Sequence, residues 1–334
     1  MKKKKLTTFL RRFGVAFILC IVLWYFIEIP LLEHLPNLMY DIFGRSPYGV
    51  QKIDKQGIPY MVYPKLGMER NPLMVAHQAI TYYSDLSNEQ NLKGFCNCTN
   101  WLAHNLTIQD NKAYAYNTFP LPAYGLNPPW ASALTQSTVL VALQLRYGYE
   151  QNNYWLDLCE KVLNTFQSGE NSFTVTLSDG SYWYEEYPSD PHSFVLNGML
   201  STLLNLHTYY TATSDTIAIK LFDKGYQAVL QKLPEYDATF ISLYDLQGRI
   251  ASMGYHCMHI DLLKELDAIR PDPLPETYIH KWSIYRYIPA PLQLIFNFKP
   301  MRCAAFCLCW LGLTALLYFL AFLYDNYKKK RRTG

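Results

Sequence analysis

Two long apolar runs near the ends of the chain limit its possible folds more than any other feature. The run 303–324 contains 22 residues without a charge, and the run 13–29 is almost wholly apolar. A helix needs roughly 17–25 such residues to cross a hydrocarbon core. The sequence therefore predicts an N-terminal membrane anchor at 13–32 and a second transmembrane helix at 303–324.

Basic residues flank the outer side of both runs. Eleven of the thirty Lys and Arg residues lie in the end segments 1–12 and 325–334. Because cytoplasmic flanks carry the excess of positive charge, we expect both termini in the cytoplasm. The domain between them, 33–300, would then lie on the lumenal, periplasmic or extracellular side. A cleaved signal peptide is the competing interpretation, but no small-x-small cleavage site follows the first run.

The domain between the two runs is acidic and rich in tyrosine. It contains 18 Lys and Arg against 25 Asp and Glu, a net charge of −7, which argues against nucleic acid as a partner. The chain is 50% hydrophobic, which excludes a disordered protein. Its 28 Tyr against 17 Phe suit a ligand such as a sugar, although packing between helices explains many of these residues equally well.

Apolar residues recur at helical spacing in six segments of this domain. Short links between helices of this length favour antiparallel helical hairpins. Ser193 and Ser214 are the predicted N-caps of the fourth and fifth helices, because a side-chain oxygen there accepts from an open backbone N–H. The six predicted helices cover 76–86, 129–147, 155–166, 194–210, 215–233 and 258–269.

Two stretches between the helices are rich in residues that favour strands. The first runs over 173–177, turns at Ser-Asp-Gly and returns over 182–184. The second covers 239–243 and returns near 249–251. Both patterns predict β-hairpins.

The string Trp-Tyr-Glu-Glu-Tyr-Pro at 183–188 is the most unusual in the chain. In an extended segment, Tyr184 and Glu186 share one face while Glu185 and Tyr187 share the other. We expect one face to point into a site. A glycosidase needs two carboxyl groups across one bond, and adjacent glutamates on opposite faces do not supply them.

Two further strings carry candidate polar groups. Ser-Phe-Val-Leu-Asn-Gly at 193–198 leads into a helix with Asn197 one turn in, and Tyr-His-Cys-Met-His-Ile at 255–260 spaces His256 and His259 by three residues. A histidine pair at this spacing suits a metal, but we find no third ligand at a suitable spacing. A hydrogen-bonding role is therefore the favoured interpretation, and no metal site is predicted.

Taken together, these strings resemble the C-terminal domain of heparosan-type D-glucuronyl C5-epimerases, which convert glucuronic to iduronic acid units within a polysaccharide. Over 70–285 the resemblance implies a mainly α fold: an (α/α) toroid or incomplete barrel with short β-hairpin inserts, here flanked by N- and C-terminal transmembrane helices. The matching segments are 71–84, 129–133 with Gln136, 183–188, 193–198, 244–246 and 255–260.

The chain also departs from that family. Vertebrate members carry a large β-sandwich after the entry segment, and residues 84–101 are too few to contain one. The family's Tyr-Asp-Leu-Arg-His becomes Tyr-Asp-Leu-Gln-Gly-Arg at 244–249, which shifts the arginine to Arg249. The expected site for the uronate carboxylate is therefore altered.

The resemblance implies a reaction and a set of residues. Epimerisation removes the proton at C5 of a uronate and returns one to the opposite face, so two groups must flank the ring. The resemblance assigns this acid–base work to Glu186 and Tyr255, with Tyr187 and Tyr244 close by, and no cofactor is expected. Arg249 is the candidate to neutralise the uronate carboxylate. The remaining candidate substrate contacts are Trp130, Gln136, Tyr184, Asn197, His256 and His259.

Two alternatives stay open beside a C5-epimerase acting on a heparosan-like polysaccharide. A polysaccharide lyase starts with the same proton abstraction and then expels the C4 oxygen, leaving an unsaturated end that absorbs ultraviolet light. A non-catalytic membrane protein that binds glycans is the other, favoured if Glu186 or Tyr255 faces the core. A homodimer is a further possible partner state.

Overall fold

The computed structural model describes residues 2–46, 48–167 and 173–333. Contacts divide the chain into two compact units, one made of 1–35 with 284–334 and the other of 36–283. The second unit contains every residue that the sequence predicts to take part in the site. Each unit is described by itself below.

The first unit contains two long helices from the ends of the chain. They are α1 (Lys2–Phe43), which belongs to this unit as far as Leu35, and α11 (Pro300–Thr333), and each includes a stretch long and apolar enough to cross a membrane. The shorter η4 (Ile284–Tyr287) and α10 (Ala290–Phe296) precede α11. Trp24 packs edge-on against Phe306 within this unit.

A buried ion pair joins these two helices. Arg302 Nη2 donates to Glu28 Oε2 at 2.8 Å, and both side chains are about 6% exposed. Arg302 also donates to Gln293 of α10. A buried charge needs such a partner, so the pair ties α1, α10 and α11 together.

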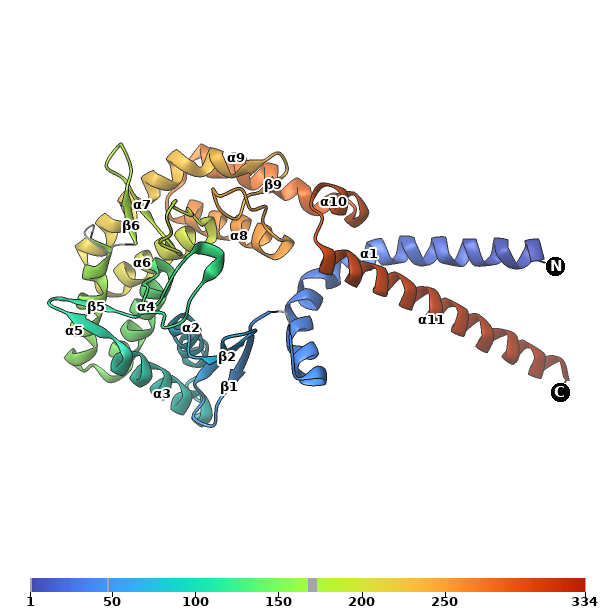
Figure 1. Cartoon of the computed structure of the whole chain (residues 1–334), viewed down its shortest axis with the longest axis horizontal. Helices are drawn as coiled ribbons and strands as arrows, with labels where there is room; N and C mark the ends of the chain where they lie inside the picture. Colours follow the sequence, from blue (N-terminus) through green and yellow to red (C-terminus); the bar gives the residue numbers. More distant parts are fainter. Residues whose placement is uncertain (1, 47, 168–172, 334) are drawn as a thin grey trace. The chain divides into compact units, whose positions relative to one another are not determined.

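The second unit is built from four helical hairpins, shown in Figure 1. In each hairpin two consecutive helices pack against each other, and the first helix of each hairpin also packs against the first helix of the next. This repeated arrangement is an incomplete (α/α) toroid, which confirms the predicted fold class. The hairpins are α2 (Pro72–Tyr83) with α3 (Glu89–Asn105), α4 (Ala133–Glu150) with α5 (Asn153–Leu163), α6 (Leu196–Thr213) with α7 (Thr216–Lys232), and α8 (Met253–Ile269) with α9 (Pro273–Ser283).

Burial separates the inner helices from the outer ones. In α4 every residue from 133 to 143 is buried, because the helix has neighbours on several sides. In α5 and α7 the buried residues fall on one stripe and polar residues occupy the rest, as expected for helices with one face in water. The inner helices therefore carry the core.

The six predicted helices are all present, with changed ends. The helix predicted from 129 begins at Ala133, because Ser132 is its N-cap and accepts from the N–H of Thr135. The predictions missed α3 and α9. Polar Asn and Gln residues obscure the apolar period of α3, and two prolines stand at the start of α9.

Both predicted N-caps are wrong. The Ser193 hydroxyl donates to the Glu185 carboxylate, and α6 begins after Val195 without a side-chain cap. Ser214 has a left-handed backbone and ends α6, while Asp215 caps α7 by accepting from two backbone N–H groups. A serine hydroxyl near a helix end hydrogen-bonds to whichever polar group lies closest, and the tertiary structure determines which group that is.

The first predicted β-hairpin is confirmed, and the second is part of a larger pairing. β6 (Thr174–Thr176) pairs with β7 (Tyr182–Tyr184). β9 (Ile241–Ser242) pairs with β8 (Asp237–Ala238), a strand that was not predicted. The predicted pairing with the segment near 249–251 is present as a single bridge between Leu243 and Ile250.

Other short elements complete the second unit. A three-stranded antiparallel sheet and a small hairpin were not predicted from the sequence, because their strands are three to five residues long. These strands are β1 (Val50–Ile53), β2 (Pro59–Tyr63), β3 (Gly67–Glu69), β4 (Thr107–Gln109) and β5 (Lys112–Tyr114), and the 3-10 turns are η1 (Pro122–Tyr124), η2 (Asn164–Phe166) and η3 (Leu233–Tyr236).

Candidate active site

Glu185 anchors the segment that leads from β7 to α6. Its carboxylate is fully buried and accepts from the Ser193 hydroxyl at 2.8 Å and from the Phe194 N–H at 3.0 Å. Its backbone carbonyl accepts from the N–H of Ala133 at the start of α4. Burial raises the pKa of Glu185 to about 7, and these donors limit the rise. Glu185 therefore closes the loop and serves the fold.

Glu186 lies against the first turn of α6. Asn197 Nδ2 donates to Glu186 Oε2 at 3.3 Å, and the neighbouring Tyr187 side chain also favours the ionised form of this carboxylate. Gly198 permits the approach, since a Cβ there would lie 2.5 Å from Glu186 Oε2. Burial raises the pKa of Glu186 to about 7, so the group changes charge near neutral pH. A carboxyl with this property suits proton transfer.

The predicted alternation of faces over 184–187 is wrong. β7 ends at Tyr184, and the backbone bends at Glu186 and Tyr187. As a result, the consecutive side chains of Glu186 and Tyr187 interact with each other. Tyr184 instead points into the core, where its hydroxyl donates to the carbonyl of Leu221. Strand alternation applies only while the backbone remains extended.

Backbone hydrogen bonds join this segment to the second β-hairpin. The N–H of Leu196 donates to the carbonyl of Tyr244 at 3.1 Å, and the N–H of Leu246 donates to the carbonyl of Ser193 at 3.0 Å. Strings about fifty residues apart in the sequence are therefore adjacent in space. This pairing brings Tyr244 beside Glu186.

Tyr187, Tyr244 and Tyr255 form a cluster with Glu186. The Tyr244 side chain lies beside those of Tyr187 and Tyr255 and interacts with both, and the Tyr244 and Tyr255 rings lie 4.8 Å apart between centroids. Burial, followed by the charge of Glu186, raises the pKa of all three phenols above its usual value. They are therefore protonated at neutral pH and available as proton donors. Glu186 and Tyr255 belong to one connected group, which we call the Glu186 cluster.

Aromatic rings cover one side of the Glu186 cluster. Tyr187 stacks on Tyr124 with centroids 4.4 Å apart and meets Trp130 edge-on at 6.0 Å. The Trp130 indole N–H donates to the carbonyl of Phe119, which fixes the ring. Trp130 therefore lies beside the cluster, where the sequence predicts a substrate contact.

Arg249 lies on the far side of Tyr124. Its guanidinium is 4.3 Å above the Tyr124 ring and pairs with buried Asp245 at 2.5 Å. Asp245 also accepts from the Tyr124 hydroxyl at 2.9 Å. The Arg249 side chain is 42% exposed, so a ligand can reach it, although Asp245 already offsets its charge. Its predicted contact with a carboxylate stays a prediction.

The two histidines support the second hairpin. His259 Nδ1 lies 2.8 Å and His256 Nδ1 2.9 Å from the Ser242 hydroxyl, and His256 Nε2 contacts the carbonyl of Trp282. Both rings are fully buried, and burial lowers the pKa of His259 to about 3. The predicted hydrogen-bonding role is thus observed, while a contact with substrate stays a prediction. In the described part of the chain, no three His, Cys, Asp or Glu side chains are grouped to hold a metal.

Gln136 is a structural tie between α4 and β5. Its amide oxygen accepts from the N–H of Ala115, and its nitrogen donates to the Ala113 carbonyl and the Thr165 hydroxyl. These bonds use its polar atoms inside the fold. The substrate contacts predicted for Gln136 and for Tyr184 stay predictions, and no exposed atom supports them.

Sequence reasoning missed three residues that shape the site. Tyr124 stacks on the cluster, Asp245 holds both Tyr124 and Arg249, and Gly198 admits Glu186. Gly198 and Asp245 lie within strings that the sequence already marks as unusual. Tyr124 had no such signal, because its place depends on the 3-10 turn η1 reaching across to Tyr187.

Comparison with known proteins bears on this site. The chain is 27% identical over 225 residues to the D-glucuronyl C5-epimerase of Caenorhabditis elegans, covering 60% of this chain and 36% of that protein. It is 28% identical over 174 residues to an uncharacterized protein of Methanocaldococcus jannaschii, covering 51% and 56%. The chain thus spans about a third to just over half of the lengths of these relatives.

Solved structures resemble the fold more remotely. The cellobiose 2-epimerase of Bacillus thermoamylovorans has a TM-score of 0.47 at 11% identity, covering 81% of this chain and 75% of that one. The cellobiose 2-epimerase of Spirochaeta thermophila has a TM-score of 0.46 at 14% identity, covering 72% and 62%. Neither likeness carries an argument about function.

A sequence model of one family matches the part of the chain that holds the site. Its description is D-glucuronyl C5-epimerase C-terminus, and it matches residues 109–284, more than half of the 334 residues. The match includes Glu186, Tyr187, Tyr244 and Tyr255. The chain therefore belongs to the D-glucuronyl C5-epimerase family, through the C-terminal region of that family.

Proposed function

We propose that the protein is an isomerase that epimerises C5 of glucuronic acid units in a heparosan-like polysaccharide. The observation that carries the proposal is the Glu186 cluster, in which a carboxyl with a pKa near 7 is linked through Tyr187 and Tyr244 to Tyr255. Family membership supports the reaction type. The polymer itself is inferred from the resemblance of the motif strings.

In the proposed reaction Glu186 is the base. Its carboxylate takes the proton from C5, and the electron pair of the C–H bond moves into the uronate carboxylate. The pKa near 7 leaves a substantial fraction of Glu186 ionised at neutral pH, while keeping it basic enough to accept a proton. Asn197 and Tyr187 hold the carboxylate in place.

Tyr255 is the acid on the opposite face. Its phenol donates a proton to C5, and the electron pair returns from the carboxylate to the new C–H bond. Tyr255 is 40% exposed, so the phenolate regains a proton from water. The Tyr244 ring lies 4.8 Å from that of Tyr255, and in the proposed reaction Tyr244 stabilises the transient phenolate. Arg249 is the group we propose to neutralise the uronate carboxylate.

We also propose that the protein is a membrane protein with its catalytic domain outside the cytoplasm. The two apolar helices support membrane attachment, and the basic residues at 1–12 and 325–334 support the orientation. A protease-protection assay tests this on sealed vesicles whose cytoplasmic side faces outward. Added protease should remove tags at both termini and leave the domain 33–300 intact.

The reaction is tested with the full-length protein in detergent, a heparosan polymer and deuterated water. Deuterium should appear at C5 by NMR together with iduronic acid units. Absorption of an unsaturated chain end in the ultraviolet would instead indicate a lyase. No deuterium at C5 and no unsaturated end would leave only glycan binding.

The variant Tyr255→Phe separates the two proton transfers. Inversion should fall about 100-fold, because the acid on one face is lost. Exchange of deuterium into retained glucuronic units should fall less, since Glu186 still removes and returns the proton on its own face. Tyr149→Phe is the matched control, because Tyr149 is 45% exposed and outside the cluster. Equal inversion by Tyr255→Phe and wild type would remove Tyr255 from the mechanism.

A further inference from the structure

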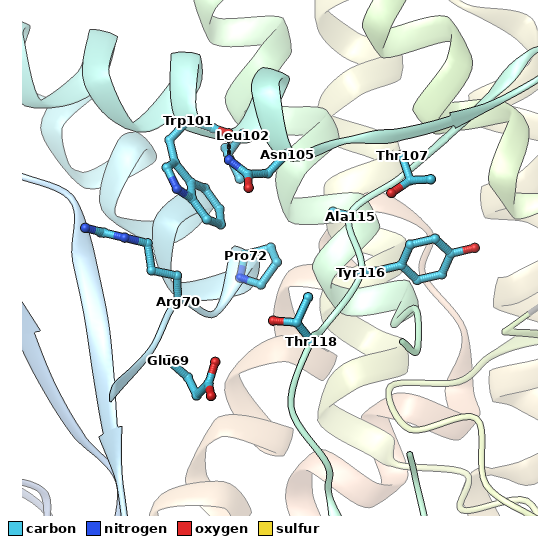
Figure 2. A pocket seen from close by; sticks show the side chains of 10 residues that line it. All are labelled: Glu69, Arg70, Pro72, Trp101, Leu102, Asn105, Thr107, Ala115, Tyr116 and Thr118. Carbon is cyan, nitrogen blue, oxygen red and sulfur yellow. Dashed lines mark hydrogen bonds between the residues drawn. The ribbon is translucent and has the colours of Figure 1, made fainter. Parts of the chain in front are cut away.

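A pocket of about 370 Å³ lies in the second unit away from the residues of the Glu186 cluster. Figure 2 shows it between the end of β3, the start of α2, the C-terminal part of α3 and the segment after β5. Its volume is within the range of small-molecule sites. None of the Glu186 cluster residues lines it. The lining residues are Glu69, Arg70, Pro72, Trp101, Leu102, Asn105, Thr107, Ala115, Tyr116 and Thr118.

The lining combines a flat aromatic surface with small polar groups. In Figure 2 the Trp101 indole extends from α3 toward the middle of the pocket, where Pro72 lies. Asn105 Nδ2 donates to the Trp101 carbonyl at 2.8 Å, which leaves its Oδ1 as an acceptor. The C–H face of a pyranose packs on an indole, and its hydroxyls need donors and acceptors at the rim. The pocket offers both.

The charges of the pocket disfavour an acidic sugar. The Arg70 guanidinium points away from the pocket in Figure 2, pairs with Asp54 at 2.5 Å and donates to the carbonyls of Ile58 and Pro59. Glu69 has no ion-pair partner among the residues that the structure describes. The remaining local charge is therefore negative and repels a carboxylate.

Packed aromatic residues connect this pocket to the Glu186 cluster. Thr118 in the pocket wall precedes Phe119, which meets Trp130 edge-on at 6.0 Å, and Trp130 meets Tyr187 at the same distance. On the other side, Asn71 follows Arg70 and donates to the Tyr63 hydroxyl, and the Tyr63 ring lies 5.1 Å from Phe119. A series of packed aromatic rings therefore runs from the pocket wall to the Glu186 cluster.

We infer that this pocket is a second carbohydrate subsite, which binds an uncharged pyranose on the face of Trp101. On the proposed function, an uncharged unit of the polysaccharide occupies it while a uronate lies at the Glu186 cluster. The negative charge of Glu69 then determines which unit of the polysaccharide lies in the pocket, because it repels the acidic unit and not the neutral one. The inference concerns binding alone and is tested without the reaction.

The test uses full-length protein labelled with 5-fluorotryptophan in a bacterial host without N-glycosylation, so that Asn105 in its Asn-Leu-Thr sequon stays unmodified. Fluorine NMR follows the Trp101 signal, which Trp101→Phe assigns. The probes are methyl β-D-glucopyranoside and methyl β-D-glucuronide, which differ in the charge at C6. The glucoside should shift the Trp101 signal saturably, with an affinity about 10-fold above that of the glucuronide, a difference of about 1.4 kcal/mol.

Two variants make the test specific. Glu69→Gln should raise the affinity of the glucuronide at Trp101 several-fold, since the repelling charge is gone. Thr118→Phe, at an exposed position in the wall, should fill the pocket and abolish the shift, whereas Tyr154→Ala, which removes an exposed aromatic ring outside the pocket, should not. A Trp101 signal that the glucoside leaves unmoved overturns the inference. An affinity for the glucuronide equal to that for the glucoside overturns the role of Glu69.

This outcome is independent of the proposed function. The Trp130 signal reports on the Glu186 cluster in the same spectra, because Trp130 contacts Tyr187. A shift at Trp101 with no deuterium at C5 of any polymer would keep the subsite and reject the epimerase. Deuterium incorporation without a shift at Trp101 would keep the epimerase and reject the subsite.

Discussion

Glu185 and Glu186 are neighbours in the sequence, are both buried, and have pKa values raised to about 7 by that burial, yet their surroundings differ. Glu185 accepts from the Ser193 hydroxyl and the Phe194 N–H inside the loop. Glu186 faces an amide and a connected series of phenols. The comparison teaches that a raised pKa alone does not mark a catalytic carboxyl. The hydrogen-bond partners distinguish the two residues, because the donors to Glu185 hold a loop in place whereas Glu186 lies beside phenols that can donate protons.

The largest effect is expected at Glu186. Glu186→Gln keeps the shape of the side chain but removes the base, so C5 deuterium incorporation should fall about 1,000-fold or more. At pH 4.5, where Glu186 is largely protonated in the folded chain, the free energy of unfolding should change by less than about 1 kcal/mol, since the amide is isosteric with the neutral carboxyl. NMR of the polymer and urea unfolding measure the two quantities. Incorporation within 10-fold of wild type would take Glu186 out of the reaction.

Gly198→Ala should displace the Glu186 side chain while leaving its carboxyl group chemically unchanged. The added Cβ would lie 2.5 Å from Glu186 Oε2 and 2.6 Å from its Cβ, so the carboxyl must move. A displacement of this size lowers the rate about 100-fold while KM changes little. Gly148→Ala is the matched control, because nothing lies within 4 Å of a Cβ there, and it should be neutral or slightly stabilising. Equal rates for both alanine variants would refute the close approach.

A smaller effect is expected on the Glu185 side. Ser193→Ala removes one of the donors to the Glu185 carboxylate, so the free energy of unfolding should fall by about 1–3 kcal/mol. Deuterium incorporation per folded molecule should fall less than for Gly198→Ala, because Ser193 does not contact Glu186. Urea unfolding and the NMR assay on the same preparation provide the comparison. A rate loss larger than that of Gly198→Ala would mean that the loop anchor is part of the chemistry.

The last effect is a pH dependence that both glutamates share. A carboxyl whose folded pKa is about 7 binds a proton more tightly in the folded than in the unfolded chain, so its contribution makes stability fall as pH rises from about 4.5 to 7. Over the same window the rate should rise, as Glu186 becomes the ionised base. Glu186→Gln should flatten the stability slope in urea unfolding curves measured from pH 4.5 to 7. An unchanged slope would show that the pKa of Glu186 is not raised.

Much of the site could be found from local sequence, and part of it could not. The strings at 183–188, 193–198, 244–246 and 255–260 each supply groups that the fold brings together. The sequence did not show that the strand ends at Tyr184, so it placed Tyr184 on the same face as Glu186. It also had no means to place Tyr124, whose stacking on Tyr187 joins residues 63 positions apart.

The sequence by itself determined the two apolar end helices, six of the eight helices of the hairpins and the residue types available for proton transfer, because apolar periodicity and composition act locally. Only the tertiary structure decided which glutamate is an anchor and which faces the tyrosines. It also decided that Arg249 pairs with Asp245 and that Trp101 lies in a separate pocket. The physical reason is that burial and hydrogen-bond partners come from segments far apart in the chain, and these set the charge state and reach of each side chain.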